Sequence, residues 1–353
     1  MEVIPSAAYV SLSVSIEEAG GVAKARELAL ELAGTLEFTG PELDRVARVV
    51  TEAATNIVQH AGKGEILLRP FALQAPVGLE VLALDQGPGI ANVAVASRDG
   101  FSTSGGAGLG LSAIARLSTC FEISSLPGKG TALLARVGGG TSKPLAQSLL
   151  QWGVVCVPKR EEKECGDAWA VTAAPGRNTV LIVDGLGHGS SAFAAAGQAL
   201  RVFREVHGAR LEEKLRALHE GLRETRGAVA ALARVDWERR EVRYAGAGNI
   251  AGTLVPASGR LANLVSHNGT LGDGVPRVQE FTYPWPDRGL LVLHSDGLSS
   301  HWDLEPYPGL TRKDPSLIAG VLYRDFASRR DDVVVFVGRE REEITTGQAG
   351  GSR

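Results

Sequence analysis

Hydrophobic and polar positions divide the first part of the chain into strands and helices. Apolar residues alternate with serines over residues 10–16, as a half-buried strand requires. Apolar residues then recur at helical spacing over 22–32, and a second helix is predicted over about 41–60, with Pro41 in its first turn. Strand-like runs follow at 65–68, 79–84, 121–124 and 131–137, and a short helix is predicted to start near Leu109. The pattern predicts helices on one face of a mixed sheet.

A second set of elements begins at Trp152, after the stretch Gly138 to Pro144, whose glycines and proline are typical of a linker. Two long helices are predicted between about residues 190 and 226. Apolar runs typical of strands lie at 152–157, 168–173, 180–183, 228–235, 290–293 and 333–337. The pattern predicts two sheets packed between helical layers.

The chain is therefore expected to be α+β with two domains. The predicted boundaries are a first domain over 1–137, a linker over 138–150, a second domain over 151–338 and a disordered tail over 339–353. With 353 residues, the chain has the length for two domains of common size.

Composition excludes several classes of protein. The net charge of −3 gives no general attraction to nucleic acid or an anionic membrane, and no apolar run approaches membrane-spanning length. The three cysteines include no close pair, which predicts reduced thiols rather than a disulfide framework or a zinc site. We expect a cytoplasmic protein that binds neither nucleic acid nor membrane.

Three polar residues of the second predicted helix, Glu52, Asn56 and His60, are each four positions apart and so are expected on one helical face. The Asn56 side-chain oxygen suits Mg²⁺, and Glu52 can accept a proton from an attacking hydroxyl. By itself the spacing also fits a solvated polar face.

Two glycine-containing segments accompany that helix. Asp85 ends an apolar strand and is followed by Gly87 and Gly89, which suits a corner that recognises a base. The stretch 105–111 alternates glycine with small residues at the start of a helix, where exposed backbone N–H groups can hold phosphates. A tight turn and a flexible hinge are the alternatives for these two segments.

Together, in this order, these segments resemble the GHKL ATPases, with their two-layer (Bergerat) α/β sandwich, and most closely their RsbT-like serine/threonine switch kinases. The resemblance covers about residues 8–137 and includes Gly-Lys-Gly-Thr at 128–131. It implies that Glu52 is the catalytic base, that Asn56 binds Mg²⁺ and that Asp85 recognises the adenine of ATP. The full set of cofactor-binding residues implied is Asn56, His60, Asp85, Gly87, Gly89, Gly106, Gly108, Leu109, Gly110 and Thr131.

Acidic residues border the apolar runs of the second domain. Asp184 follows the run 180–183, Asp296 follows 290–293, and Asp331 and Asp332 precede 333–337. Carboxylates at neighbouring strand ends can form an oxygen-rich pocket for two Mg²⁺ or Mn²⁺ ions. Any single Asp-Gly pair is also explained as a turn, as at 99–100 and 273–274.

The order of these segments resembles the PPM phosphatases, with their four-layer α-β-β-α sandwich, in the compact branch that includes RsbX and the stage II sporulation phosphatase. The motifs are Asp-Gly-Leu-Gly-His-Gly at 184–189, Ser-Asp-Gly at 295–297 and the acidic pair at 331–332. The resemblance implies that Asp184 bridges two metal ions and is catalytic together with Asp296. The metal ligands implied are Asp167, Asp184, the Gly185 carbonyl, Asp296, Asp331 and Asp332, although only one of the last two need be a ligand. His188 either touches phosphate or begins the following helix.

The two resemblances imply a bifunctional regulator of bacterial partner switching. The first domain would phosphorylate Ser or Thr of a STAS-domain protein with ATP, within a stressosome-like assembly or a sigma-factor pathway, and the second would remove such phosphates with Mg²⁺ or Mn²⁺. The alternative is a phosphatase whose ATP-binding domain only regulates it or binds a sigma-factor or STAS partner. No histidine-bearing helix pair precedes the first domain, which argues against a sensor histidine kinase.

Overall fold

The computed structural model describes residues 10–71, 78–96, 110–138, 148–258, 261–274 and 277–341. Three of the predicted cofactor-binding residues, Gly106, Gly108 and Leu109, lie outside these ranges, as do residues 139–147 of the predicted linker. No helix in the described ranges combines the length and the apolar character needed to cross a bilayer.

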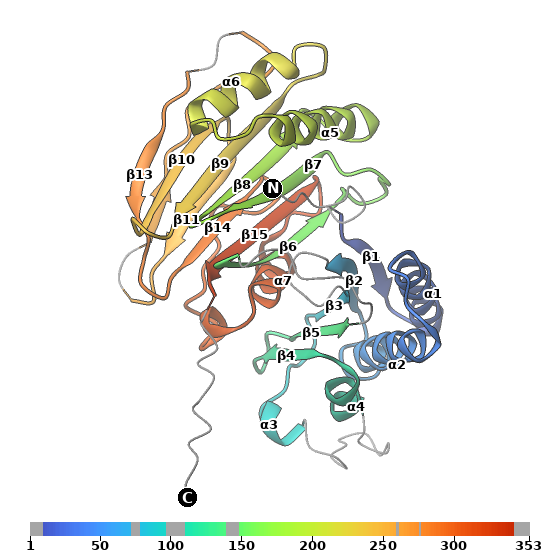
Figure 1. Ribbon diagram of the computed structural model, residues 1–353. Coiled ribbons are helices and arrows are strands. Elements are labelled where there is room, and N and C mark those ends of the chain that lie inside the picture. The colour runs from blue at the N-terminus through green and yellow to red at the C-terminus, as the bar shows by residue number, and fades with distance from the viewer. Residues whose placement is uncertain are drawn as a thin grey trace, which may run out of the picture.

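The first unit is one sheet with helices on one face, as predicted (Figure 1). Its strands stand in the order β1-β2-β3-β5-β4, and every pair is antiparallel, so the expectation of a mixed sheet was wrong. Short connections, such as the one from β2 to β3, join neighbouring strands antiparallel without a crossover helix. The strands are β1 (Leu12–Ile16), β2 (Gly64–Phe71), β3 (Gly78–Asp85), β4 (Cys120–Ser125) and β5 (Thr131–Gly138). The helices are α1 (Ala19–Thr35), α2 (Gly40–Asn56), α3 (Val93–Ala96) and α4 (Gly110–Leu117).

The second unit contains two antiparallel five-stranded sheets. One has the strand order β13-β10-β9-β8-β7 and the other β12-β11-β14-β15-β6. The strands are β6 (Leu150–Val157), β7 (Asp167–Ala174), β8 (Arg177–Gly185), β9 (Ala228–Asp236), β10 (Glu241–Ala247), β11 (Ala251–Val255), β12 (Ala262–Leu264), β13 (Phe281–Pro284), β14 (Leu290–His294) and β15 (Val333–Glu340). The helices are α5 (Ser190–Glu205), α6 (Leu211–Gly221) and α7 (Pro315–Phe326).

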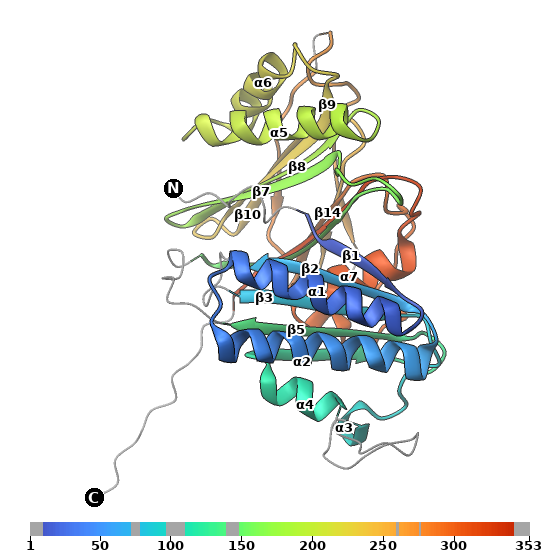
Figure 2. The ribbon, with the colours of Figure 1, turned by 90° about the vertical axis from the view of Figure 1, so that its right-hand side faces the viewer.

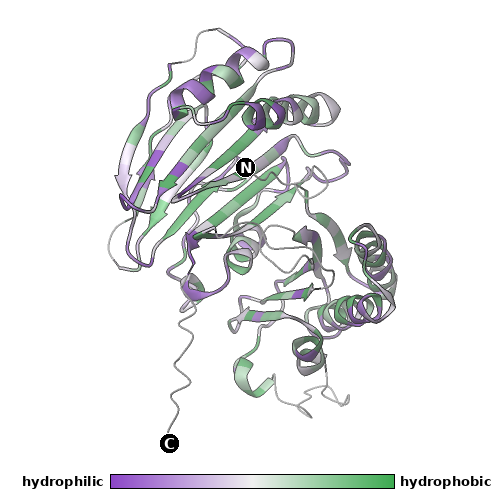
Figure 3. Ribbon diagram, in the orientation of Figure 1, coloured by the Kyte–Doolittle hydropathy of each residue, from purple (hydrophilic) through white to green (hydrophobic). Residues whose placement is uncertain are grey.

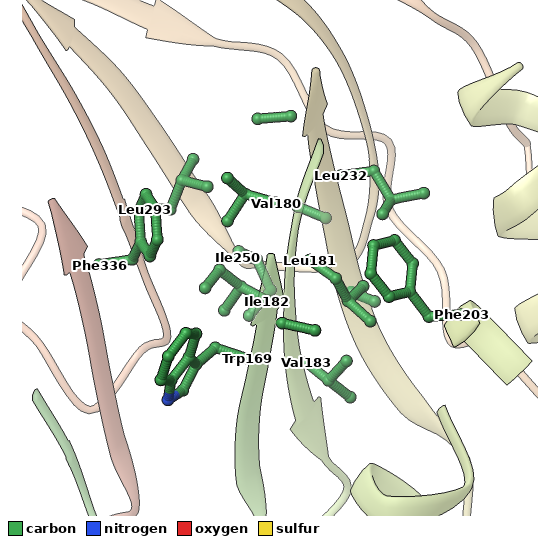
Figure 4. Packing of buried hydrophobic residues seen from close by; sticks show 14 of the residues in the cluster. Trp169, Val180, Leu181, Ile182, Val183, Phe203, Leu232, Ile250, Leu293 and Phe336 are labelled. Atoms are coloured by element: carbon green, nitrogen blue, oxygen red, sulfur yellow. The ribbon is translucent and has the colours of Figure 1, made fainter. Parts of the chain in front are cut away.

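These elements form the predicted four-layer sandwich. Helices α5 and α6 cover the outer face of the first of these two sheets, and α7 covers the outer face of the other (Figure 2). Along β8, Val180 and Ile182 point toward Phe336 of β15, whereas Leu181 points toward Phe203 of α5 (Figure 4). This alternation places apolar layers on both sides of β8.

Helix α7 was not predicted, and it joins the two units. It packs against β6 and β15 on one side and against β3 and β5 of the first unit on the other. A Cβ atom on Gly320 would lie 3.2 Å from Leu84, and one on Gly153 of β6 would lie 2.0 Å from the Ser316 nitrogen. The small residues therefore let the backbone of α7 approach both sheets. Strands from both units and α7 share one apolar core.

Buried ion pairs cross the same interface. Arg136 of β5 pairs with Glu80 of β3 at 2.8 Å and with Asp314, the residue before α7, at 2.8 Å. Glu80 also pairs with Arg69 of β2 and accepts a hydrogen bond from Ser316. The two arginines beside Glu80 lower the pKa of its carboxyl to about 2, against the opposing effect of its burial. The charges are thus paired within a cluster drawn from both units.

The domain boundaries differ slightly from those predicted. Gly138 still belongs to β5, and β6 begins at Leu150, so the predicted linker is strand at both ends. Strand β15 extends to Glu340 because Arg339 and Glu340 pair with residues of β6, so these two residues do not belong to the tail. Residues 342–353 lie outside the described ranges.

Candidate nucleotide and metal sites

Helix α2 presents Glu52 and Asn56 to the start of α4. A Cβ atom on Gly110 would lie 3.1 Å from Asn56 Oδ1 and 3.4 Å from Glu52 Oε2, so the predicted base and the predicted Mg²⁺ ligand meet there. The Asn56 Nδ2 atom is buried with no hydrogen-bond partner in the described ranges. An amide in this position is suited to a ligand that supplies the missing partner.

His60 lies beyond the α-helical part of the predicted second helix. The α-helix ends at Asn56 and continues as a π-helical turn, Ile57–Ala61, which contains His60. His60 is exposed and lies within electrostatic range of Asp85.

Asp85 stands at the end of β3 and is held by backbone groups from two segments. Its Oδ1 atom accepts hydrogen bonds from the Gly87 nitrogen at 2.9 Å and the Thr131 nitrogen at 3.1 Å. Gly89 has a positive φ of 73°, and a Cβ atom there would lie 2.1 Å from the Leu126 carbonyl oxygen. Burial raises the pKa of Asp85, and the two backbone N–H groups oppose the rise. The structure thus brings Gly87, Gly89 and Thr131 around Asp85.

The second unit has a cavity lined by acidic residues from three strand ends. Asp184 is the penultimate residue of β8, Asp296 follows β14, and Asp331 precedes β15; all three line the cavity. Burial and the neighbouring carboxylates, first Asp296 and then Asp331 and Asp332, raise the pKa of Asp184 to about 7. The predicted convergence of these carboxylates is therefore present in the fold.

Two of the predicted ligands are held behind this cavity. Asp332 is buried, and its two oxygens accept hydrogen bonds from the Lys159 and Gly166 nitrogens at 2.8 and 2.9 Å. Asp167 lies opposite Asp184 in the strand register and accepts a hydrogen bond from Ser295 at 2.5 Å, while its Oδ1 atom has no partner in the described ranges. Of the adjacent pair, Asp331 faces the cavity and Asp332 holds the loop.

The donor set fits a hard divalent cation, although the side chains do not form a closed coordination sphere. No three His, Cys, Asp or Glu side chains within the described ranges are close enough together to hold a metal ion as they stand. The neighbouring carboxylates repel one another, and Asn249 donates a 2.8 Å hydrogen bond to Asp296. A donor set of carboxylate oxygens suits Mg²⁺ or Mn²⁺. Behind this set lies Asp167 Oδ1, which has no hydrogen-bond partner in the described ranges.

Sequence reasoning missed two residues that contact these sites. Asn249 lies in the stretch Ala-Gly-Ala-Gly-Asn, which resembles a stretch of the phosphatases. Its spacing from Asp296 in the sequence did not predict the contact between the two side chains. Arg324 of α7 donates to the Asp85 carbonyl at 3.3 Å from 239 positions away in the chain. His188 does not begin α5, which starts at Ser190; it pairs with Glu162 at 2.9 Å at the cavity edge.

Comparisons with known proteins agree with this division. Residues 17–137 match the family described as histidine kinase-like ATPase domain, and residues 174–337 match the stage II sporulation protein E (SpoIIE) family. The serine/threonine-protein kinase RsbT of Bacillus subtilis (strain 168) is 40% identical over 114 residues, which cover 32% of this chain and 86% of RsbT. The chain belongs to the RsbT family. Its RsbT-like unit is the first unit, which carries the Asp85 site.

The second unit is of the SpoIIE/PP2C phosphatase type. The phosphoserine phosphatase RsbX of Bacillus subtilis (strain 168) is 23% identical over 183 residues, covering 51% of this chain and 90% of RsbX. A solved structure described as the bacterial stressosome, a modular system adapted to control secondary messenger signaling, matches 54% of this chain and all of that chain, with 30% identity and a TM-score of 0.51. The chain therefore combines the kinase-like and phosphatase domains of Rsb-type partner-switching proteins. Domains of the first type use a nucleotide, and domains of the second type use a metal ion.

Proposed function

We propose that the chain is a two-way phospho-switch, in which the first unit phosphorylates Ser or Thr of a STAS-domain protein with ATP and the second hydrolyses phosphoserine or phosphothreonine. The observation that carries the proposal is the meeting of Glu52, Asn56 and Gly110 in one unit of a chain whose other unit gathers Asp184, Asp296 and Asp331. Likeness to RsbT and RsbX supports the two directions of transfer.

In the kinase direction, the chain's own residues position the nucleotide and take up a proton. Asp85 Oδ2 would accept a hydrogen bond from the amino group of adenine, while Oδ1 is fixed by Gly87 and Thr131. Asn56 would hold Mg²⁺, an ion that would screen the charge of the phosphates. Glu52 accepts the proton of the acceptor hydroxyl beside the start of α4, where backbone N–H groups favour phosphate.

In the phosphatase direction, Asp184, Asp296, Asp331 and the Gly185 carbonyl hold Mg²⁺ or Mn²⁺ at the cavity. Such ions supply a nucleophile from bound water at neutral pH and neutralise the phosphate. Asp332 keeps the loop at Gly166 in place, and Asn249 orients Asp296. Asp167 and Ser295 support the ligand shell from behind.

One experiment tests both directions. The full-length chain is mixed with radiolabelled ATP and a STAS-domain protein that carries an acceptor Ser or Thr, and label on the acceptor is followed with time. Glu52→Gln should lower label transfer by about 100-fold, within the range of general-base catalysis, and leave phosphatase activity unchanged. Asp296→Asn should instead let label accumulate, because its removal stops.

The matched control for Glu52 is Glu31→Gln, an exposed carboxylate on α1, which should change neither activity. Label transfer by Glu52→Gln at the wild-type rate would remove Glu52 from the proposed role. Normal release of phosphate by Asp296→Asn, with Mn²⁺ present, would remove the metal assignment.

A further inference from the structure

A five-residue segment at the end of α7, Arg324 to Ser328, contacts both candidate sites. At its first residue, Arg324 Nη1 donates to the Asp85 carbonyl oxygen at 3.3 Å, and Gln86 Nε2 donates to the Arg324 carbonyl oxygen at 3.3 Å. Asp85 is the residue assigned to adenine, and Gln86 follows it in the chain. The nucleotide site is thus bonded directly to the phosphatase unit, through backbone as well as side chain.

The other end of the segment is bonded to the loop that carries Asp296. The Ser328 nitrogen donates to the Gly297 carbonyl oxygen at 2.9 Å, and the Ser299 nitrogen donates to the Phe326 carbonyl oxygen at 3.0 Å. Leu298 and Ala327 form a β-bridge between the two segments. Three residues beyond Ser328 the chain reaches Asp331, so the segment borders metal-site carboxylates in space and in sequence.

Side chains tie the segment to a second part of the nucleotide site. Two of the three guanidinium nitrogens of Arg324, Nε and Nη2, donate to Asp325 at 2.9 and 2.6 Å, and Tyr307 donates to Asp325 at 2.8 Å. The ammonium group of Lys129, in the Gly-Lys-Gly-Thr element, lies 4.9 Å from the centre of the Tyr307 ring. The segment is therefore connected by contacts to both loops that surround Asp85.

Close packing limits how this segment can respond. Arg324 is 4% exposed, and the apolar residues of α7 before it are buried against both sheets. Because Arg324 is closely packed, a shift at the Asp85 carbonyl is expected to move the backbone of the segment or its neighbours. One such neighbour is the Gly297 carbonyl, next to Asp296.

We propose that adenine nucleotide bound at the Asp85 corner is an allosteric activator of the phosphatase site, acting through Arg324 to Ser328. The inference rests on the nucleotide and metal sites of the proposed function, but not on phosphoryl transfer. A nucleotide that orders Asp85 and Gln86 also orders the segment bonded to them and, through it, the Asp296 loop. Metal binding to a loop that the nucleotide has already ordered loses less conformational entropy, so the two binding events favour each other.

The test uses full-length protein, a non-hydrolysable ATP analogue and constant free Mn²⁺. Nucleotide binding is measured by calorimetry, and hydrolysis of p-nitrophenyl phosphate is measured with and without the analogue. Saturating analogue should raise the hydrolysis rate at limiting Mn²⁺ by about fivefold or more. Hydrogen exchange should slow at the Ser299 and Ser328 amides, a readout that needs no turnover.

Two variants interrupt the link, and one serves as a control. Arg324→Gln removes the bond to the Asp85 carbonyl, and Gln86→Ala removes only an exposed side chain, so it is the safer variant for folding. Both should bind the analogue and lose most of the fivefold response. Arg329→Gln is the matched control: Arg329 pairs with Glu65 across the same interface at 3.0 Å but has no contact with Asp85 or Gln86 in the described ranges. It should respond like the wild type.

The outcomes separate this inference from the proposed function. Analogue that binds without changing either the hydrolysis rate or exchange at Ser299 and Ser328 overturns the coupling and leaves the kinase assignment standing. A full response in both Arg324→Gln and Gln86→Ala overturns the route. A response without any transfer of label to a STAS protein sustains the coupling and removes the kinase. Failure of the analogue to bind removes the nucleotide site and both proposals with it.

Discussion

Asp85 and Asp184 are both partly buried acids at strand ends, yet their surroundings differ. Two backbone N–H groups hold one oxygen of Asp85. Asp184 faces Asp296, Asp331 and Asp332, and its pKa rises to about 7. Hydrogen bonds within the protein therefore hold the nucleotide corner, whereas the carboxylates of the metal cavity repel one another until a cation or a proton binds.

This difference predicts how each site responds to loss of its ligand. A preorganised corner should keep its shape without nucleotide, because its hydrogen bonds lie within the protein. A carboxylate cluster should take up protons or a metal ion, so its stability should depend on both. The following predictions test that contrast.

The largest effect is expected from Asp184→Asn. Loss of a carboxylate shared by both proposed metal positions should lower phosphatase activity by at least the roughly 100-fold that outer-shell partners cost, and leave label transfer from ATP unchanged. Phosphate release from a phosphoserine protein at saturating Mn²⁺ measures it. Asp273→Asn, an exposed acid in an Asp-Gly turn, is the control. Equal activity of the two variants would show that the cavity is not the metal site.

A smaller effect is expected from Asp85→Asn. The amide can still accept from Gly87 and Thr131, but it loses the charged acceptor for the base. A hydrogen bond to a charged group contributes about 1.5–3 kcal/mol, so nucleotide affinity should fall by roughly 10- to 100-fold. Calorimetric titration measures the change, with exposed Asp44→Asn on α2 as control. Affinity within twofold of the wild type would place the base elsewhere.

The smallest effect is a pH dependence of metal-free stability. Because the folded pKa of Asp184 is raised from 3.8 to about 7, the folded state holds more protons than the unfolded state between those values. The contribution of Asp184 to stability is therefore fully present below about pH 4 and is lost as pH rises toward 7. Burial lowers the pKa of His294, which gives an opposite slope, so only the difference between wild type and Asp184→Asn isolates Asp184.

Urea unfolding in EDTA at pH 5 and pH 7 measures that difference. Relative to Asp184→Asn, the wild type should lose stability between the two pH values, and saturating Mg²⁺ or Mn²⁺ should abolish the loss. A wild type that gains stability relative to the variant would contradict the repulsion.

Strand-end acids were predictable because their signal is local. Asp184, Asp296 and Asp331 each border a strongly apolar run. Antiparallel pairing of β14 with β15 brings Asp296 and Asp331 to one edge of their sheet, and Asp184 lines the same cavity from β8 of the other sheet. The π-helical turn that contains His60 could not be predicted, because nothing in the spacing distinguishes it from an α-helical turn. Which of Asp331 and Asp332 faces the cavity also depended on hydrogen bonds to Lys159 and Gly166, far away in the chain.

Helix α7 was missed for a different reason. Consecutive residues from Leu317 to Leu322 are buried because the helix has a sheet on each side, as the apolar strands around it in Figure 3 illustrate. An amphipathic pattern requires one face in water, and this helix has almost none. Its visible signal was only Asp314 followed by Pro315, a helix start in which the aspartate accepts from the Ser316 nitrogen.

The double covering of α7 has a consequence for any attempt to divide this protein. Cutting the polypeptide between β5 and β6 and separating the halves would expose Leu82, Leu84 and Leu134 on one fragment and the face of α7 around Gly320 on the other. It would also leave Arg136 and Asp314 without each other. Each fragment would expose an apolar surface that carries unpaired charges, and such surfaces promote aggregation. Expressed separately, each half would need another binding partner on this surface to stay in solution.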